Sequence, residues 1–173
     1  NKYLNSRWTV WVHRNDCQDW TVNGYQFIWT IDSLSSFWRF FNNFQKINKE
    51  ENQFFIMRDK IKPIYEDNNN RKGGRCSLKL DCYDRNNKND SGCEVMEVLC
   101  LLIMNETLIP DTDEINGISY SIKNRSILIK LWSKEFEIDI KEKLPKNLIN
   151  KISSAIKNHT FRKFDNNISI RYT

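Results

Sequence analysis

Alternating apolar and polar residues mark two early stretches of the chain as strands. Residues 8–12 and 25–31 carry the β-branched and aromatic side chains that are typical of half-buried strands. A polar stretch separates them and contains Trp20. We therefore predict two strands joined by a loop that carries a large aromatic side chain.

Three other stretches have the spacing of helices. A short polar side chain at Asp32 or Ser33 can accept hydrogen bonds from the free N–H groups of a first turn, so we predict a helix from there to about Gln45. Residues 94–104 are apolar almost all round, which indicates a helix covered on more than one side. Apolar residues at helical spacing predict a third helix, and these are Leu148, Ile149, Ile152 and Ile156.

The other patterned segments are typical of strands. Residues 54–57 and 77–83 predict two strands on either side of a polar, glycine-containing loop over residues 65–74. Residues 118–123 and 127–132 predict a hairpin around a turn at 124–126. Two closing strands are predicted after it, one near Phe161 and one over residues 168–172.

The order of these elements predicts the fold class. Helices and hairpins interleave without regular strand–helix–strand units, and no glycine-rich phosphate-binding motif occurs. We therefore predict an α+β fold with a mainly antiparallel sheet, which about three helices cover on one face. The other face is then available for a ligand. A chain of 173 residues, 39% of them hydrophobic, suits one domain over residues 1–173.

The net charge of the chain is compatible with a polyanionic partner, and its aromatic content indicates aromatic side chains on the surface. The net charge of +5 and the pI near 8.9 fit such a partner but are also common in proteins that bind none. Six Trp, six Tyr and ten Phe exceed what a core of this size requires. We therefore expect some aromatic side chains to lie on the surface.

The cysteines do not form a metal-binding pattern. They are odd in number, contain no CxxC pair, and could be joined as ligands only by His13 and His159. We expect no metal and no cofactor. No signal peptide or membrane-spanning apolar run occurs, so we expect a reducing setting, cytoplasmic or also nuclear, without a membrane.

Three short motifs carry a family resemblance. They are RWTVW at residues 7–11, PIYED at 63–67 followed by RKGGR at 71–75, and ILIKLW at 127–132. In order and spacing they resemble the cap-binding family of eukaryotic translation initiation factor 4E, from about Leu4 to the third helix. The resemblance implies a curved antiparallel sheet that binds capped mRNA, with 7-methyl-GTP as the minimal ligand.

The chemistry of the cap explains the residue types at these positions. Methylation at N7 gives guanine a positive charge, so two electron-rich rings can sandwich it by stacking and cation–π attraction. The resemblance assigns the two rings to Trp20 and to Tyr65, where the family usually has tryptophan. It also implies that Glu66 accepts two hydrogen bonds from the Watson–Crick edge of the base.

A third aromatic residue, Trp132, is implied to contact the N7 methyl group. Strand alternation supports this assignment, because residues of opposite parity face opposite sides of a sheet. We expect the core side to hold Ile127, Ile129 and Leu131. We expect the ligand side to hold Leu128, Lys130 and Trp132.

The triphosphate bridge of the cap requires cations. Arg75 and Lys123 match the phosphate-binding positions of the family, and Arg125 lies in the hairpin turn. Leu128 stands where the family usually has a third phosphate-binding lysine. Lys130, on the same strand face, is the expected substitute.

A second surface is expected on the first helix. Its apolar residues cover an arc of about 180°, wider than one buried stripe requires, and Leu34 and Trp38 lie toward one edge. Either the helix is packed unusually deeply, or this edge binds a partner. The resemblance favours a partner site formed with Val95 and Leu99, for a scaffold protein of the initiation factor 4G type or a repressor peptide.

Other interpretations remain open. Trp20 alone could be a hydrophobic plug, and each charged residue alone could be ordinary surface charge. A cap-binding repressor that does not recruit the scaffold is one alternative function. A metal-dependent nuclease or decapping hydrolase is another, with an acidic and basic set formed by Glu66, Asp67, Lys79 and Asp81. We expect no catalytic residues, no enzyme activity, and a monomer in the absence of partners.

Overall fold

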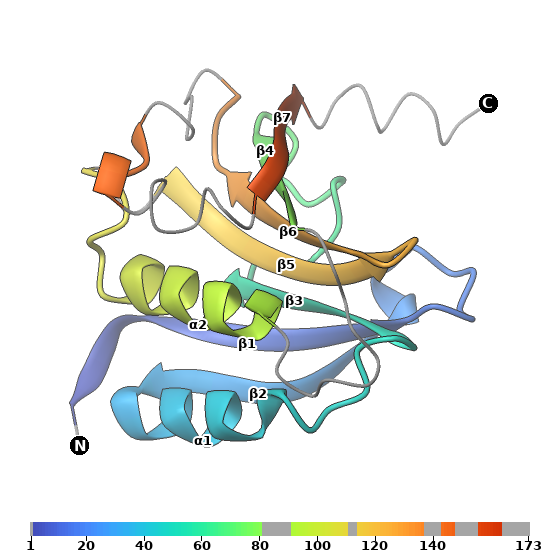
Figure 1. Ribbon diagram of the computed structural model, residues 1–173, viewed down its shortest axis with the longest axis horizontal. Helices are drawn as coiled ribbons and strands as arrows, with labels where there is room; N and C mark the ends of the chain where they lie inside the picture. The colour runs from blue at the N-terminus through green and yellow to red at the C-terminus, as the bar shows by residue number, and fades with distance from the viewer. Residues whose placement is uncertain (1, 81–90, 111–113, 137–142, 148–155, 164–173) are drawn as a thin grey trace.

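Seven strands in the described part of the chain pair into one antiparallel sheet, and two α-helices cover one of its faces (Figure 1). The computed structural model describes residues 2–80, 91–110, 114–136, 143–147 and 156–163. The strand order is β2-β1-β3-β5-β6-β4-β7. The strands are β1 (Tyr3–Arg14), β2 (Tyr25–Ser33), β3 (Asn52–Arg58), β4 (Gly74–Leu80), β5 (Ile115–Lys123), β6 (Ser126–Ser133) and β7 (Ile156–Lys163). The helices are α1 (Leu34–Phe44) and α2 (Ser91–Met104), with a short 3-10 turn, η1 (Val22–Gly24).

Helix α1 begins where the sequence predicts. The Ser33 hydroxyl accepts a hydrogen bond from the backbone N–H of Ser36, and the Ser36 hydroxyl accepts one from the backbone N–H of Ser33. This reciprocal cap satisfies donors that a first turn leaves without partners. The buried face consists of Phe37, Phe40, Phe41 and Phe44. Burying each such ring contributes about 1.5–3 kcal/mol, which fixes α1 to the sheet.

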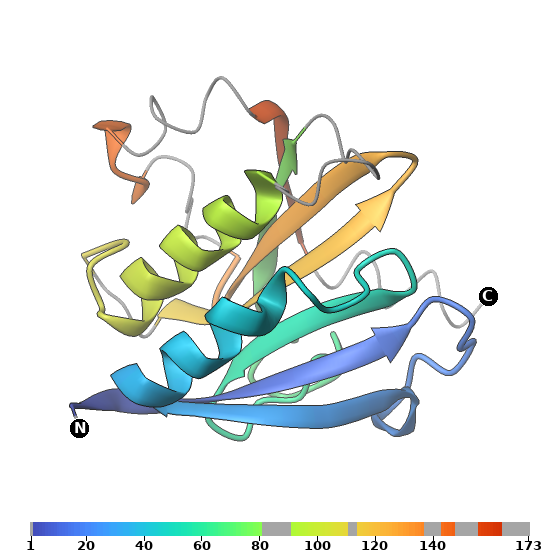
Figure 2. The same cartoon turned by 60° about the horizontal axis from the view of Figure 1, so that its bottom comes forward.

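Helix α2 lies beside α1 on the same face of the sheet (Figure 2). It begins at Ser91, three residues before the predicted start, and ends at Met104 as predicted. Met96, Leu99 and Cys100 are fully buried. These positions share one face of the helix, and Val98 on the opposite side is 41% exposed, so the predicted cover on more than one side is wrong at Val98. In the described part of the chain, no helix is long and apolar enough to cross a membrane.

The chain segment predicted as a third helix differs from the expectation. Residues 148–155 and 168–172 lie outside the described residues, but Ile156 begins strand β7 and so is not helical. Strand β7 pairs with β4, in a register that places Ile156 opposite Leu80 and Phe161 opposite Cys76. Hydrogen bonds along this sheet edge outweigh the helical spacing of the apolar residues. The predicted strand near Phe161 is confirmed.

The β5–β6 hairpin follows the predicted alternation. Asn124 and Arg125 both have positive φ angles, 50° and 62°, as a tight two-residue hairpin turn requires. Both strands are longer than predicted, because pairing extends from Lys123 and Ser126 to Ile115 and Ser133. Ile127, Ile129 and Leu131 belong to the main core. Trp132 belongs to a separate cluster with Tyr25, Phe55 and Met57 on the opposite face.

The long connection from β3 to β4 closes tightly onto β6. The Asp67 carboxylate accepts hydrogen bonds from the backbone N–H groups of Lys62 and Asn69, at 3.0 and 2.9 Å. Gly73 lies so close to the backbone of Ser133 that an added Cβ would overlap its carbonyl oxygen. Strand β4 therefore begins at Gly74, three residues before the predicted start, and Arg75 pairs directly with Trp132.

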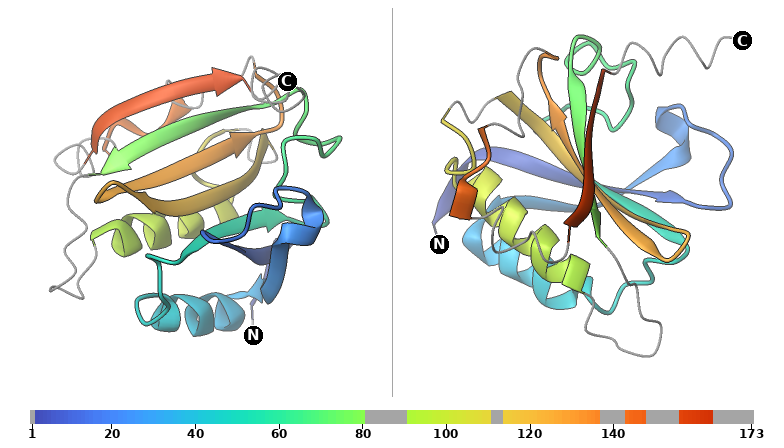
Figure 3. Two further views of the ribbon diagram at one scale, coloured as in Figure 1. Left: turned by 90° about the vertical axis from the view of Figure 1, so that its right-hand side faces the viewer. Right: turned by 45° about the horizontal axis from the view of Figure 1, so that its top comes forward.

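The sheet is curved, and the helices lie on one side of it (Figure 3). The first two strands confirm the predicted pair but are longer, since β1 spans Tyr3–Arg14. On β1, Trp8, Val10 and Val12 face the main core. By alternation Trp11 and His13 face the side that the helices leave uncovered. The candidate site forms on that face.

Candidate nucleotide-binding site

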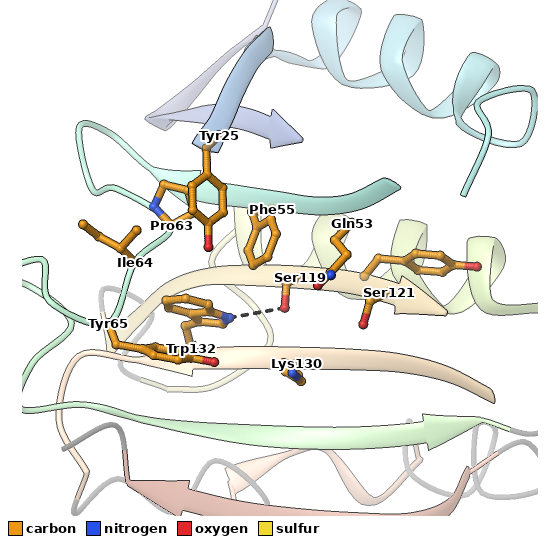
Figure 4. A pocket seen from close by; sticks show the side chains of 11 residues that line it. Tyr25, Gln53, Phe55, Pro63, Ile64, Tyr65, Ser119, Ser121, Lys130 and Trp132 are labelled. Carbon is orange, nitrogen blue, oxygen red and sulfur yellow. Dashed lines mark hydrogen bonds between the residues drawn. The ribbon is translucent and has the colours of Figure 1, made fainter. Parts of the chain in front are cut away.

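A small hollow on the uncovered face of the sheet brings several predicted residues together. Its lining comes from four strands and from the loop after β3: Tyr25, Gln53, Phe55, Pro63, Ile64, Tyr65, Ser119, Tyr120, Ser121, Lys130 and Trp132. Figure 4 shows Tyr65 beside Trp132, and Tyr25 and Phe55 across the hollow. The enclosed volume is about 30 Å³. This is room for about two water molecules and is far too small for a purine.

The small volume has a specific cause: Tyr65 stacks on Trp132. Their ring centroids are 5.2 Å apart, with the planes 28° from parallel. Trp132 is only 2% exposed, and its Nε1 donates a hydrogen bond of 3.3 Å to the Ser119 hydroxyl. This bond fixes the indole in plane. Tyr65 is therefore the movable partner of the pair, because it lies on a loop whereas Trp132 lies on a central strand.

Arg75, a predicted phosphate-binding residue, contacts the aromatic pair through Tyr65. Its Nη1 donates a hydrogen bond to the Tyr65 hydroxyl, and its guanidinium carbon lies 5.5 Å from the centroid of the Tyr65 ring. The structure thus brings Tyr65, Arg75 and Trp132 into one group. A tryptophan at position 65 has no hydroxyl, so this particular bond depends on the tyrosine.

Trp20 occupies the β1–β2 loop, as predicted, and rests on a residue that sequence analysis did not single out. Its ring stacks on His13, with centroids 3.9 Å apart and planes 9° from parallel. His13 is fully buried, and its Nε2 donates a hydrogen bond of 2.8 Å to the backbone carbonyl of Asp19. Trp20 itself is 37% exposed. One face of the indole is therefore held by the protein while part of the ring remains accessible.

The loop around Trp20 is braced on both sides. The Asp19 carboxylate accepts hydrogen bonds from the hydroxyl and the backbone N–H of Thr21, at 2.6 and 2.8 Å, and these bonds lower the pKa of Asp19. An added Cβ at Gly24 would overlap the Asp19 carbonyl oxygen, so only glycine fits there. The platform at Trp20 is consequently preformed.

The structure does not place every predicted residue in the hollow. Trp20 and Glu66 are not among the residues that line it. Tyr25 connects the hollow with the Trp20 platform. It lines the hollow, and it contacts the ring of His13, on which Trp20 stacks, edge-on at 4.8 Å. Glu66 directly follows Tyr65 and is half-buried. Its neighbour Asp67 is used to hold the loop, and Asp81 lies outside the described residues.

Three of the predicted phosphate-binding cations lie along the β5–β6 hairpin. Lys130 lines the hollow, and Lys123 shares a strand face with Ser119 and Ser121, which also line it. At about 3.3 Å per residue, Lys123 lies about 13 Å along β5 from Ser119. Lys123 and Arg125 are both exposed. Leu128, on the same face of β6 as Lys130, is half-buried.

Sequence analysis missed His13, Ser119 and Tyr25 as parts of this site. A usable signal existed for His13, because it lies two residues after Trp11 on a strand and must share its face. No such signal marked Ser119 as the partner of Trp132. Among the described residues, no group of three His, Cys, Asp or Glu side chains lies close enough to share a metal ion.

The opposite surface of the molecule has a small exposed apolar group. Leu34 is 37% and Trp38 is 41% exposed, which excludes the deep packing of α1 considered above. From α2, Val95 is half-buried and Val98 is 41% exposed, whereas Leu99 is fully buried. Leu99 therefore belongs to the core and cannot contribute to a surface. The preceding residue along the chain, Val98, is exposed, and we call Leu34, Trp38, Val95 and Val98 the dorsal patch.

Comparison with protein families identifies the class to which this chain belongs. The model of the family "Eukaryotic initiation factor 4E" matches residues 3–173. The chain belongs to this family.

Similar proteins include eukaryotic translation initiation factor 4E of Xenopus laevis, 28% identical over 137 residues, which are 78% of this chain and 62% of that protein. The human factor is 27% identical over 137 residues, 78% of this chain and 61% of that protein. The match thus spans about three-fifths of the length of these relatives.

Two solved structures show the same fold. The C. elegans eIF4E-3 in complex with the 4E-binding protein Mextli has a TM-score of 0.79 at 19% identity, and the match covers 96% of this chain and 95% of that one. The Ascaris suum eIF4E-3 in complex with an m7G cap has a TM-score of 0.72 at 19% identity, covering 88% and 84%. The predicted fold class is therefore confirmed.

Proposed function

We propose that this chain binds the 7-methylguanosine cap of mRNA non-covalently, on the face of the sheet that the helices leave uncovered. One observation carries the proposal: Tyr65, Trp132 and Arg75 form one contacting group beside a preformed Trp20 platform. Membership of the initiation factor 4E family supports it, as does the m7G cap in the complex of the Ascaris suum protein.

Binding requires Tyr65 to leave Trp132. The present hollow of about 30 Å³ has no room for a purine, so the Tyr65 ring must swing outward with its loop. The methylated base then stacks between Trp20 and Tyr65, and Trp132 contacts the N7 methyl group. Each stacked face contributes about 1–3 kcal/mol. Glu66, next to Tyr65, accepts hydrogen bonds from the N1–H and the exocyclic amine of the base.

The phosphates then lie along the cations of β4 and the hairpin. Arg75 grips the phosphate nearest the base, and Lys130, Lys123 and Arg125 bind the negative charge farther along. Because Arg75 donates to the Tyr65 hydroxyl, movement of Tyr65 makes this one Nη1 donor available to a phosphate. Base stacking and phosphate binding are therefore coupled through one hydrogen bond.

The dorsal patch supplies the partner-binding part of the function. We infer that it takes an apolar helix face from a scaffold protein of the initiation factor 4G type or from a repressor, in the cytoplasm. Trp38 has the size and exposure of an anchor residue. The C. elegans neighbour, bound to the 4E-binding protein Mextli, supports a partner of this kind.

A pull-down separates scaffold recruitment from the alternative function, in which this chain is itself a cap-binding repressor that does not recruit the scaffold. A scaffold peptide with a tyrosine and two apolar residues at helical spacing is immobilised and offered the wild-type chain and the Trp38→Ala variant. Trp38-dependent capture supports scaffold recruitment. Absence of capture by a chain that still binds 7-methyl-GTP supports a repressor instead.

Retention on immobilised 7-methyl-GTP tests cap binding itself. The chain should bind the resin and elute with free 7-methyl-GTP but not with GTP. Trp29→Ala is a matched control for Trp20→Ala, since both tryptophans are 37% exposed but Trp29 donates to the α1 backbone instead. Loss of retention in Trp20→Ala alone supports the proposal, and equal elution by GTP contradicts it.

A further inference from the structure

A second and larger hollow lies on the same uncovered face, beside the first. It has a volume of about 920 Å³, within the range of small-molecule sites. Its lining comes from β1, β2, the end of β3 and nearby loops: Arg7, Thr9, Trp11, Phe27, Thr30, Arg58, Asp59, Lys60, Ile61, Lys62, Asn69, Asn116 and Lys134. The loop after β3 separates the two hollows, with residues 63–65 lining one and residues 59–62 the other.

The charge of this second hollow is strongly positive at its rim. Arg7, Lys60 and Lys134 are exposed and Lys62 is half-buried, against the single carboxylate of Asp59. Within the described residues, none of these four cations makes a salt bridge. Glu114 lies two residues before Asn116, which lines the hollow, and its carboxylate forms a salt bridge of 2.9 Å with Lys143. The rim therefore presents positive charge that the protein does not neutralise.

Arg58, although it lines the hollow, has a structural role. Its Nε donates to the Ile115 carbonyl at 3.0 Å, and its guanidinium lies over the Trp8 ring at 4.6 Å. We do not count it among the available cations.

The hollow also contains an aromatic platform. Phe27 is 54% exposed on the edge strand β2, and it meets Trp11 edge-on with ring centroids 6.3 Å apart. The ammonium group of Lys62 lies 4.8 Å above the Trp11 ring. An exposed ring beside unneutralised cations is the combination by which single-stranded nucleic acids are held, since bases stack on rings and phosphates meet cations.

We propose that this second hollow binds single-stranded RNA, with one base on Phe27 and adjacent phosphates at Lys60 and Lys134. The hollow is distinct from the cap site, so it does not require a methylated base or a cap. An acidic peptide would engage the cations but would leave the exposed ring unused. The chain would then hold RNA at two places on one face, through a selective site and a sequence-tolerant one.

The test uses a fluorescently labelled, uncapped oligouridine and measures anisotropy with the full chain. The double variant Lys60→Glu/Lys134→Glu should weaken binding by at least about tenfold. Between about 50 and about 200 mM salt, the slope of log binding constant against log salt concentration should become shallower by about 1.4. This corresponds to about 0.7 for each of the two lost phosphate contacts. Phe27→Ala should weaken binding by about tenfold with the salt slope unchanged, because it removes stacking rather than charge.

The control is Lys2→Glu/Lys46→Glu, which makes the same change in net charge at two exposed positions outside the hollow. It should leave oligouridine binding within about twofold of wild type. Binding of 7-methyl-GTP should be unchanged in all variants, so failure of the cap site is detected separately. An equal loss in the control, no effect of the hollow variants, no oligouridine binding at all, or equal competition by polyglutamate would each overturn the proposal.

Discussion

The imidazole of His13 lies flat against the indole of Trp20, with ring centroids 3.9 Å apart and planes 9° from parallel. His13 is fully buried and is held by its bond to the Asp19 carbonyl, so it supports Trp20 from a fixed position. A binding surface that is ordered before the ligand arrives avoids the entropy cost of ordering it on binding. We therefore regard His13 as the positioning residue of the Trp20 platform.

Replacing His13 tests this support. His13→Ala should lower the free energy of unfolding by about 2–4 kcal/mol, because it leaves a cavity under Trp20. It should also weaken 7-methyl-GTP binding by about tenfold, since Trp20 loses its backing. His13→Phe retains a flat ring and should bind within about threefold of wild type. Urea unfolding and fluorescence titration measure the two effects, and equal cap affinity in all three proteins would refute the role of His13.

Tyr65 offers a change in the opposite direction. Tyr65→Trp should tighten 7-methyl-GTP binding by about threefold to tenfold, because the larger ring overlaps more of the base. The loss of the hydroxyl should add to the gain, since the bond from Arg75 holds Tyr65 in the ligand-free position that it must leave. Isothermal titration calorimetry checks this, with Tyr65→Phe as the control that removes only the hydroxyl. Weaker binding by Tyr65→Trp would contradict the stacking of residue 65 on the base.

Two phosphate-binding residues should differ in importance. Arg75→Ala should weaken binding of 7-methyl-GTP more than Lys123→Ala, by about tenfold against about threefold. Arg75 forms a planar fork next to the aromatic pair, whereas Lys123 is an exposed point charge. The difference should shrink with 7-methylguanosine, which has no phosphates. A larger loss from Lys123→Ala would place the phosphates farther along the hairpin than we propose.

Cysteine labelling tests the orientation of α2. Burial raises the pKa of the Cys100 thiol well above its usual range, and Glu97 adds to the shift. Cys100 should therefore resist iodoacetamide until urea unfolds the chain, whereas the half-buried Cys17 should react in the native state. Mass spectrometry of digested protein follows both sites. Similar native labelling rates at the two would mean that α2 does not bury the face that holds Leu99 and Cys100.

Alternation and capping carried most of the fold prediction. The parity of residues 127–132 placed Trp132 opposite the core, and Ser33 marked the start of α1. Both are local patterns, in which neighbours in sequence fix the geometry. Ile156 shows the limit: helical spacing suggested a helix, but pairing with β4 made a strand. That partner lies far away in the sequence, so no local pattern reveals it.

The site was harder to predict because its contacts join distant segments. Trp132 and Tyr65 were both expected near the base, but their mutual stacking depends on how the loop after β3 folds onto β6. Leu99 and Val98 show a different limit. Adjacent helical residues point about 100° apart, so an uncertainty of one position decides between core and surface. The structure shows that Val98 is exposed and Leu99 is buried, which the spacing alone did not decide.

Tryptophan fluorescence during titration with 7-methyl-GTP, compared with GTP, tests cap binding most directly. Stacking of the charged base on Trp20 should quench emission with 7-methyl-GTP at concentrations where GTP has little effect. Trp20→Ala should lose the quench, and Trp29→Ala should keep it. Equal responses to the two nucleotides, or an unchanged quench in Trp20→Ala, would contradict a methyl-selective site at Trp20.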